Sequence, residues 1–327
     1  MRLDIRYSTR FDYETSVAES QNELRACPAS DDRQALLHYN VTTTPSSRIA
    51  WYADHWGTRV DTFGVRLPHR CLEVVAEATV ETWPQALITA APTRAALEDP
   101  DFRDGHLEFL SESEHVRPGP EVTAAAKRAA EVAGNDVIGA ALAIHRTVSG
   151  SLTYAPGETY VGVGVDDVFG SGRGVCQDLA HLAVAMYRSL GMPARYVSGF
   201  LYAADDATGA EVLGDEVEVQ THAWVEVASP TGDPRRGRGG ATWLALDPTN
   251  QLEVGEQHVT IGRGRDYDDV APFRGVFSGR SDHELAVSVA MRRLAVEPTD
   301  EPAGRSSVRQ QERIQQRQAQ QEQAQQQ

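Results

Sequence analysis

The chain has 327 residues, of which 41% are hydrophobic, and it carries a formal net charge of −16. This length and composition are typical of a folded protein with two sizeable cores, and they exclude a chain that is disordered throughout. The acidic balance argues against nucleic acid or an anionic membrane as partner, because both would repel the chain. No apolar run reaches the ~20 residues of a membrane span and none opens the chain as a signal peptide would, so we expect a cytoplasmic protein.

The first 85 residues alternate apolar and polar side chains, as in Leu3-Asp4-Ile5-Arg6-Tyr7 and again over residues 71–82. This alternation is typical of antiparallel strands that bury one face, and turn-forming residues separate the stretches. Trp83-Pro84 ends the region. We predict an antiparallel β domain over residues 1–85, folded as a sandwich or a barrel.

Residues 86–297 combine helical and strand-like patterns. Apolar residues recur at helical spacing from Cys176 to Leu190, and Gly191-Met192-Pro193 then ends that helix. Further helices are predicted at 93–97, 122–133 and 137–149, and strands at 193–203, 218–228, 242–247 and 283–293. A layer of helices against an antiparallel sheet is an α+β fold, which we predict for this second domain.

The last stretch, residues 298–327, has eleven glutamines between residues 310 and 327. Almost none of its side chains can enter a hydrophobic core, so we predict a disordered, solvated tail.

Cys176 lies where a glycine-rich segment becomes the predicted helix. Unpaired N–H groups and the positive end of the helix dipole favour a thiolate over a thiol at that position. Glycines such as Gly174 leave room for a substrate carbonyl, whose developing oxyanion could face the N–H of Cys176. A buried cysteine is more often a small core residue, which is the interpretation we give Cys27 and Cys71.

An imidazole and a carboxylate follow at the ends of two predicted strands, at His222 and Asp247. The segment between them, 229–241, is rich in turn formers, so the two strands are expected to pair antiparallel. That pairing would bring Asp247 beside His222, where a carboxylate fixes the ring tautomer. A thiol, an imidazole and a carboxylate together are the groups of a nucleophilic acyl-transfer site.

These segments resemble the transglutaminase-like superfamily in its bacterial form, over roughly residues 140–275. The resemblance rests on Gly174-Val175-Cys176-Gln177-Asp178, the run from Ala185 to Phe200, Thr221-His222-Ala223-Trp224 and Asp247-Pro248-Thr249-Asn250. It implies a papain-like core in which Cys176 is the nucleophile, His222 the general base and acid, and Asp247 the orienting carboxylate.

The start of the chain resembles the β-rich domain that precedes this core in bacterial members, through Tyr7, Phe11-Asp12-Tyr13, Asn22-Glu23-Leu24-Arg25, Pro28 and Asp54-His55-Trp56-Gly57. Bacterial members are regarded as peptidases or amidases, so the resemblance favours hydrolysis of an amide or peptide bond over cross-linking.

Other residues are weaker candidates for the oxyanion site or the substrate pocket. They are Gly174, Asp178, Trp224 and Tyr160, with Tyr154 as the other tyrosine that could supply a hydroxyl. Asp178 is equally explained as a favourable charge at a helix start. His181 lies about 140° round the helix from Cys176, so we interpret it as structural. The carboxylates of Asp266-Tyr267-Asp268-Asp269 are expected on the solvated surface, with a cleft-lining role as the alternative.

The sequence predicts no cofactor and no metal. A zinc site of Cys176, His181 and His222 would lack the paired spacing of zinc ligands, and no calcium loop is present. The expected partner is a peptide or protein substrate, with water or an amine as the group that resolves the thioester; the residues do not decide between the two. The alternative function is an inactive peptide-binding or scaffold protein of the same fold, which would have no need of the three catalytic side chains.

Overall fold

The computed structural model describes residues 1–86, 88, 92–157, 162–202, 214, 216–231 and 239–295. Residues Met1–Leu294 form one compact unit. Tyr160 and the predicted tail at 298–327 lie outside the described residues. Among the helices that are described, none is long and apolar enough to cross a membrane.

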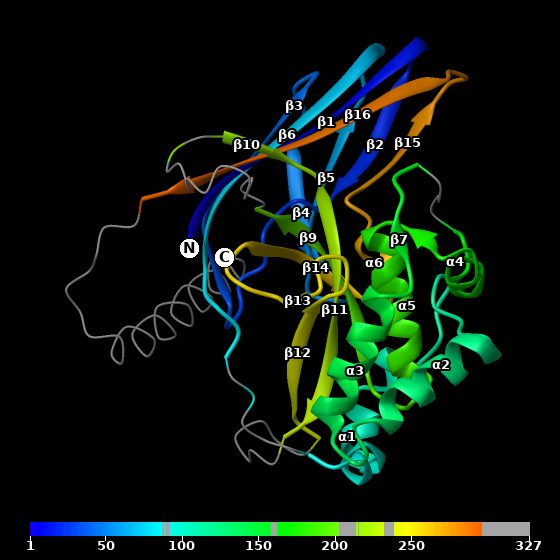
Figure 1. Cartoon of the computed structure of the whole chain (residues 1–327). Coiled ribbons are helices and arrows are strands. Elements are labelled where there is room, and N and C mark those ends of the chain that lie inside the picture. Colours follow the sequence, from blue (N-terminus) through cyan, green and yellow to red (C-terminus); the bar gives the residue numbers. More distant parts are fainter. Residues whose placement is uncertain are drawn as a thin grey trace. The chain divides into compact units, whose positions relative to one another are not determined.

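Two antiparallel sheets enclose the first core (Figure 1). One sheet has the order β10-β16-β1-β6-β3, and the other has the order β15-β2-β5-β4. Their strands are β1 (Arg2–Val17), β2 (Glu19–Leu24), β3 (Gln34–Thr44), β4 (Ile49–Ala53), β5 (Arg59–Val65), β6 (His69–Thr82), β10 (Glu216–Val219), β15 (Phe273–Ser278) and β16 (His283–Leu294). The alternation seen in the sequence places Leu3, Ile5 and Tyr7 of β1 inside this core.

Strands from the far end of the described chain complete this β-rich part. β16 pairs along β1 from Leu294 opposite Arg2 to His283 opposite Tyr13, and β15 pairs with β2. The strand that the sequence predicted at 283–293, within the second domain, therefore belongs to the sheet of residues 1–85. Alternation tells which side chains are buried, but it does not tell which strand pairs with which.

The second core lies between a sheet of order β13-β12-β11-β9-β14 and a layer of helices. The strands are β9 (Ala194–Leu201), β11 (Thr221–Pro230), β12 (Ala241–Asp247), β13 (Leu252–Glu253) and β14 (His258–Gly264). The helices α2 (Pro120–Glu131), α3 (Val137–Ser149) and α5 (Cys176–Arg188) cover one face of it (Figure 1). Shorter elements are α1 (Pro100–Gly105), α4 (Val165–Ser171), α6 (Tyr267–Val270), the 3-10 turns Arg94–Glu98 and Leu107–Phe109, and the parallel pair β7 (Thr153–Tyr154) and β8 (Arg173–Gly174). This is the α+β fold that the sequence predicted.

Helix α5 is the centre of the second core. Every residue from Asp178 to Arg188 is buried, including the polar ones, so the helix has no solvated face. Arg188 is accommodated because its guanidinium donates to three backbone carbonyls, those of Ser111, Ala194 and Arg265. The apolar stripe in the sequence predicted a helix with one buried face. The polar side chains are buried as well, because they have partners that the sequence does not reveal.

The predicted strand at 218–228 is two strands that belong to different sheets. β10 ends at Val219 in the first sheet, and β11 begins at Thr221 in the other, with Gln220 between them. The chain thus passes from the β sandwich to the second sheet immediately before His222.

A buried ion cluster connects the two parts of the unit. The carboxylate of Glu226 on β11, 1% exposed, accepts from Arg195 Nε (2.7 Å), Arg263 Nε (2.9 Å) and Arg33. Arg263 also pairs with Asp31 at 2.6 Å. Burial alone would raise the pKa of Glu226, but the three guanidinium groups hold it well below its usual range.

Candidate active site

Cys176 is the first residue of α5, as the sequence predicted. The carboxylate of Asp178 accepts a hydrogen bond from the N–H of Val175 at 2.8 Å, which fixes the start of the helix. A Cβ on Gly174 would lie 2.9 Å from the Cβ of Asp178, so this approach requires glycine. Gly174 and Asp178 therefore position the loop and the helix start that carry Cys176.

His222 and Asp247 come together from neighbouring antiparallel strands. In β11 and β12, Val225 lies opposite Leu246, a register that brings the start of one strand to the end of the other. Nε2 of His222 lies 2.8 Å from Oδ2 of Asp247. The antiparallel hairpin predicted from residues 222–247 thus produces the expected imidazole–carboxylate pair.

The imidazole of His222 also interacts with Cys176. Burial alone would lower the pKa of His222, but hydrogen bonds with Asp247 and with Cys176 outweigh it and raise the pKa to about 9. Because Nε2 is engaged with Asp247, Nδ1 is the ring nitrogen left for the thiol. The arrangement favours an imidazolium beside Cys176.

Asp247 is completely buried and surrounded by N–H donors. Oδ1 accepts from the backbone N–H groups of Thr249 (3.0 Å) and Asn250 (3.2 Å), and Oδ2 accepts from Nδ2 of Asn250 at 2.7 Å. Burial alone would raise the pKa of this carboxyl, but the hydrogen bonds from His222, His258 and Asn250 hold it well below its usual range. Asp247 is therefore a fixed anion behind His222.

His258 is a second histidine on the same carboxylate oxygen. Its Nε2 lies 3.1 Å from Oδ2 of Asp247, and its Nδ1 accepts from the N–H of Gly255 at 3.2 Å. An accepting Nδ1 leaves the proton of the neutral ring on Nε2, so His258 donates to Asp247. No sequence pattern pointed to His258, since β14 was not among the predicted strands, whereas Asn250 lay within the Asp247-Pro248-Thr249-Asn250 segment.

The ring of Trp224 packs against the rings of His222 and His258. It is fully buried, and its ring lies edge-on to His258 with centroids 5.2 Å apart. A Cβ on Gly199 would come within 2.5 Å of the Trp224 ring, so the glycine on β9 makes room for it. Trp224 was expected at the substrate pocket, but it does not line the pocket in the described residues.

A pocket of about 350 Å³ opens at Cys176 and His222. Its lining consists of Tyr154, Cys176, Leu201, the segment Glu218–His222, Thr249 and Asn250. Tyr154 is half-exposed, and burial together with the nearby Cys176 raises the pKa of its phenol. Its hydroxyl is therefore protonated at neutral pH, and Tyr154 lines the pocket as a potential hydrogen-bond donor.

His222, Asp247 and His258 also form the one cluster of three potential metal ligands found among the described residues. Their ligand atoms lie within 4.8 Å of one another. The hydrogen bond from Gly255 to Nδ1 of His258 places a proton on Nε2, the atom that would have to bind the metal. The three side chains therefore fit a hydrogen-bonded cluster better than a metal centre.

His181 is separate from the site, in agreement with its predicted structural role. Its Nε2 accepts from the N–H of Tyr267 at 3.1 Å, and its ring stacks on His115. Burial lowers the pKa of His181 to about 3, so the ring is neutral. It cannot join Cys176 and His222 in a zinc site while it holds this position.

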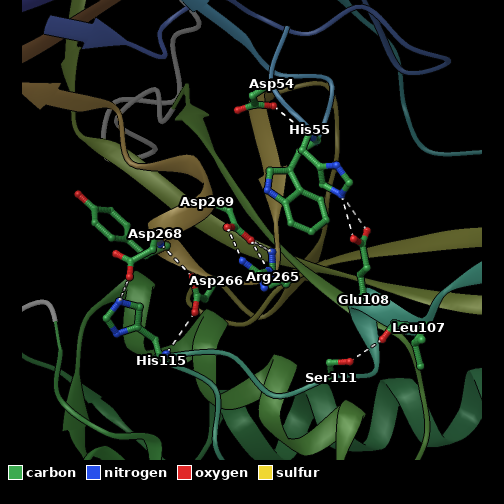
Figure 2. A network of polar contacts seen from close by, with 12 residues as sticks. Asp54, His55, Leu107, Glu108, Ser111, His115, Arg265, Asp266, Asp268 and Asp269 are labelled. Carbon is green, nitrogen blue, oxygen red and sulfur yellow. Dashed lines mark hydrogen bonds and ion pairs between the residues drawn. The ribbon is translucent and has the colours of Figure 1, made fainter.

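Figure 2 shows a polar network that includes His115, Arg265 and Asp266. Asp266 is buried, and it accepts from the backbone N–H groups of His115 (3.2 Å) and Asp268 (3.0 Å). Asp269 pairs with Arg265 at 2.9 Å. The expectation that Asp266–Asp269 are simply solvated carboxylates is therefore wrong for Asp266, which is buried and whose burial the N–H groups of His115 and Asp268 compensate. None of these residues lines the pocket at Cys176.

The turn Asp54–Gly57 belongs to the same region (Figure 2). The carboxylate of Asp54 accepts from the N–H of Trp56 at 3.0 Å, and Gly57 adopts a φ of 79° that favours glycine. His55 Nε2 lies 2.9 Å from Glu108, while Arg265 packs over the Trp56 ring. This turn holds the β sandwich against the helical part.

Two segments of the chain match known protein families. Residues 3–81 match the family described as the bacterial transglutaminase-like N-terminal region, and residues 124–248 match the transglutaminase-like superfamily. An uncharacterized protein of Mycobacterium leprae is 37% identical over 294 residues, which cover 90% of this chain and 99% of that protein. An uncharacterized protein of Mycobacterium tuberculosis is 30% identical over 295 residues, covering 87% of this chain and 90% of its own.

A solved structure shares the fold. The crystal structure of a putative cysteine protease from Cytophaga hutchinsonii superimposes with a TM-score of 0.66 and 21% identity, over 93% of this chain and 95% of that one. With both sequence segments matched and a relative aligned over nearly its whole length, the chain belongs to the transglutaminase-like superfamily and carries the N-terminal region of its bacterial members.

Proposed function

We propose that this chain is a cysteine enzyme that hydrolyses an amide or peptide bond through a thioester on Cys176. The observation that carries the proposal is the 2.8 Å contact between His222 and Asp247 beside a pocket that His222 and Cys176 line together. A substrate entering this pocket meets the thiol and the imidazole at once. The relation to a putative cysteine protease of the same fold supports hydrolysis as the reaction.

The reaction starts from an ion pair, in which the thiol proton has already passed to Nδ1 of His222 and Cys176 is a thiolate. The Cys176 Sγ then forms a bond to the substrate carbonyl carbon, and the carbonyl oxygen becomes an oxyanion. Unpaired N–H groups in the first turn of α5 are suited to stabilise that charge, with Tyr154 as a second donor. When the tetrahedral intermediate collapses, the C–N bond breaks and His222 gives its proton to the leaving amine.

In the second half, water attacks the thioester. His222 removes one proton from the water, the C–S bond breaks, and the pair of Cys176 thiolate and His222 imidazolium is restored. An amine acceptor would follow the same steps, with a new C–N bond in place of the acid. Asp247 holds the His222 ring in position and stabilises its charged form in both halves.

The test is mass spectrometry of a peptide library incubated with the chain, with and without added primary amines. We expect carboxylic acid products that incorporate oxygen from labelled water, and no products with Cys176→Ala. Amine-conjugated products in excess of acids would identify a transferase instead. Peptides that bind but yield no product with the wild-type chain would identify an inactive peptide-binding protein.

A further inference from the structure

The pocket at Cys176 continues into a second hollow. A neighbouring pocket of about 460 Å³ is lined by Glu218–Thr221 together with Val287 and Val289 of β16. The segment Glu218–Thr221 lines both pockets, so the two are neighbours that share one wall, and we call them together the groove. This groove leads from the thiol to the edge of the first sheet.

β16 offers an open strand edge at that point. On one side it pairs with β1 from Leu294 to His283, but on the other side β10 covers only residues 289–292. Within the described part of the chain, no strand pairs with residues 283–288 on the β10 side (Figure 1). The backbone N–H and C=O groups along such an edge can pair with an added strand.

The side chains next to this edge are apolar and accessible. Leu285 and Val287 are 55% and 49% exposed, although they share a strand face with Val289 and Met291, which are buried in the first core. The core-facing side of β16 therefore continues beyond the core as an exposed apolar strip. Val287 of this strip lines the groove.

The charge of the groove points to a basic ligand. Glu218 is exposed and lines both pockets, and the one cationic side chain among their lining residues is His222, at the thiol end. Among the described residues, no cation forms an ion pair with Glu218. A cationic side chain placed there would gain a partner in a strongly acidic protein.

We infer that an extended segment of the substrate peptide binds as an added strand along residues 283–288 of β16. Its backbone pairs with the open edge, its apolar side chains lie against Val287 and Leu285, and a basic side chain meets Glu218. Main-chain pairing supplies affinity and the side-chain contacts supply selectivity. This inference rests on the proposed function for the reacting carbonyl, but binding in the groove does not require the chemistry.

The experiment measures peptide binding to the full-length Cys176→Ala chain, which cannot form a thioester. Fluorescence anisotropy would compare a basic–apolar peptide, its acidic counterpart and a version with N-methylated backbone amides, which cannot pair as a strand. We expect N-methylation and Glu218→Lys each to weaken binding of the basic peptide about tenfold, with Glu218→Lys gaining affinity for the acidic one. Val287→Asp should weaken the binding of both peptides that can pair as a strand, the basic one and the acidic one.

The matched control is Glu216→Lys, an exposed glutamate on the same strand that lines neither pocket. It should leave the affinity unchanged. Equal binding of all three peptides, or equal losses in Glu216→Lys and Glu218→Lys, would overturn the inference. A dimer of the chain would also overturn it, if Val287→Asp dissociates that dimer and added peptide does not. A second copy of the chain would then occupy the strand edge.

These outcomes are distinguishable from a failure of the proposed function. If the wild-type chain binds the basic peptide with the expected selectivity but yields no product, the catalytic proposal fails and the strand-pairing inference stands. If the chain cleaves peptides at a rate that Glu218→Lys and Val287→Asp leave unchanged, the strand-pairing inference fails and the catalytic proposal stands.

Discussion

Nε2 of His258 lies 3.1 Å from Oδ2 of Asp247, and both side chains are almost completely removed from solvent. The hydrogen bond from Gly255 to Nδ1 makes this ring a neutral donor to the carboxylate. His258 therefore withdraws part of the charge that Asp247 presents to His222. We expect it to act as a positioning residue, since the pocket lining does not include it.

Replacement of His258 tests this role. We expect His258→Phe to lower kcat about tenfold, the size of one hydrogen bond to a charged group. Because Asp247 would lose a donor, its attraction for the His222 proton would grow, and the basic limb of the pH–rate profile would move to higher pH. His258→Gln, which keeps an N–H donor, should restore much of the rate. A purely structural role would leave the basic limb in place.

Compared with His258→Phe, Asp247→Asn should lower kcat more and should shift the basic limb of the pH–rate profile in the opposite direction. The neutral amide cannot stabilise the imidazolium, and its NH₂ group favours the wrong His222 tautomer, so we expect kcat to fall by about 10³- to 10⁴-fold. The basic limb should move to lower pH, because the hydrogen bond and the charge that raise the pKa of His222 are lost. A variant that keeps a tenth of the wild-type kcat would contradict the role of Asp247.

The pH dependence of the wild-type chain follows from His222. Its pKa is raised from 6.5 to about 9, so the imidazolium, which is the proposed proton donor to the leaving amine, is lost as the pH rises through about 9. The free energy of unfolding should change in the same direction. The stabilising contribution of His222 is fully present below about pH 6.5 and is lost as the pH rises through about 9. Rate and unfolding measurements over this range check both statements. A rate that stays flat well above pH 9 would contradict them.

The same linkage applies to Asp247 with the sign reversed. Its pKa is lowered from 3.8, so its stabilising contribution is present above that value and is lost as the pH falls. Acid unfolding of Asp247→Asn should therefore depend less on pH than that of the wild-type chain. Parallel curves for the two proteins would count against the buried anion.

The buried ion cluster predicts a stability effect that is separate from catalysis. Glu226→Gln would leave the guanidinium groups of Arg33, Arg195 and Arg263 without their shared carboxylate, which should cost about 3–5 kcal/mol in the free energy of unfolding. The matched control is Glu77→Gln, because Glu77 pairs with Arg6 at 2.8 Å with both side chains about half exposed. That surface pair should cost less than about 1 kcal/mol. Urea unfolding measures both, and similar losses would contradict the account.

The sequence alone predicted the positions of Cys176, His222 and Asp247 in the fold, because these positions follow from local rules. A glycine-rich loop before an apolar helical stripe places Cys176 at a helix start, and two strands joined by a turn-rich segment bring His222 to Asp247. The family resemblance predicted the α+β core and the β-rich domain, and both are confirmed.

The features that the sequence did not predict depend on contacts between distant segments. His258 reaches Asp247 because β14 pairs with β9, and β14 has no period that distinguishes it from a loop. The strand change at Gln220 was hidden in a segment that resembles one continuous strand. The pairing of β16 with β1 joins the two ends of the compact unit, and alternation cannot select that partner.

The central claim is that Cys176 is the nucleophile and that His222 activates it. The most direct measurement is labelling of the chain with a thiol-directed peptide-amide probe, followed by peptide mapping to locate the adduct. We predict one adduct, on Cys176, that is lost in Cys176→Ala, greatly slowed in His222→Ala and unchanged in Cys71→Ala, since Cys71 is the other partly exposed thiol. Equal labelling of the wild-type, Cys176→Ala and His222→Ala chains would contradict the account.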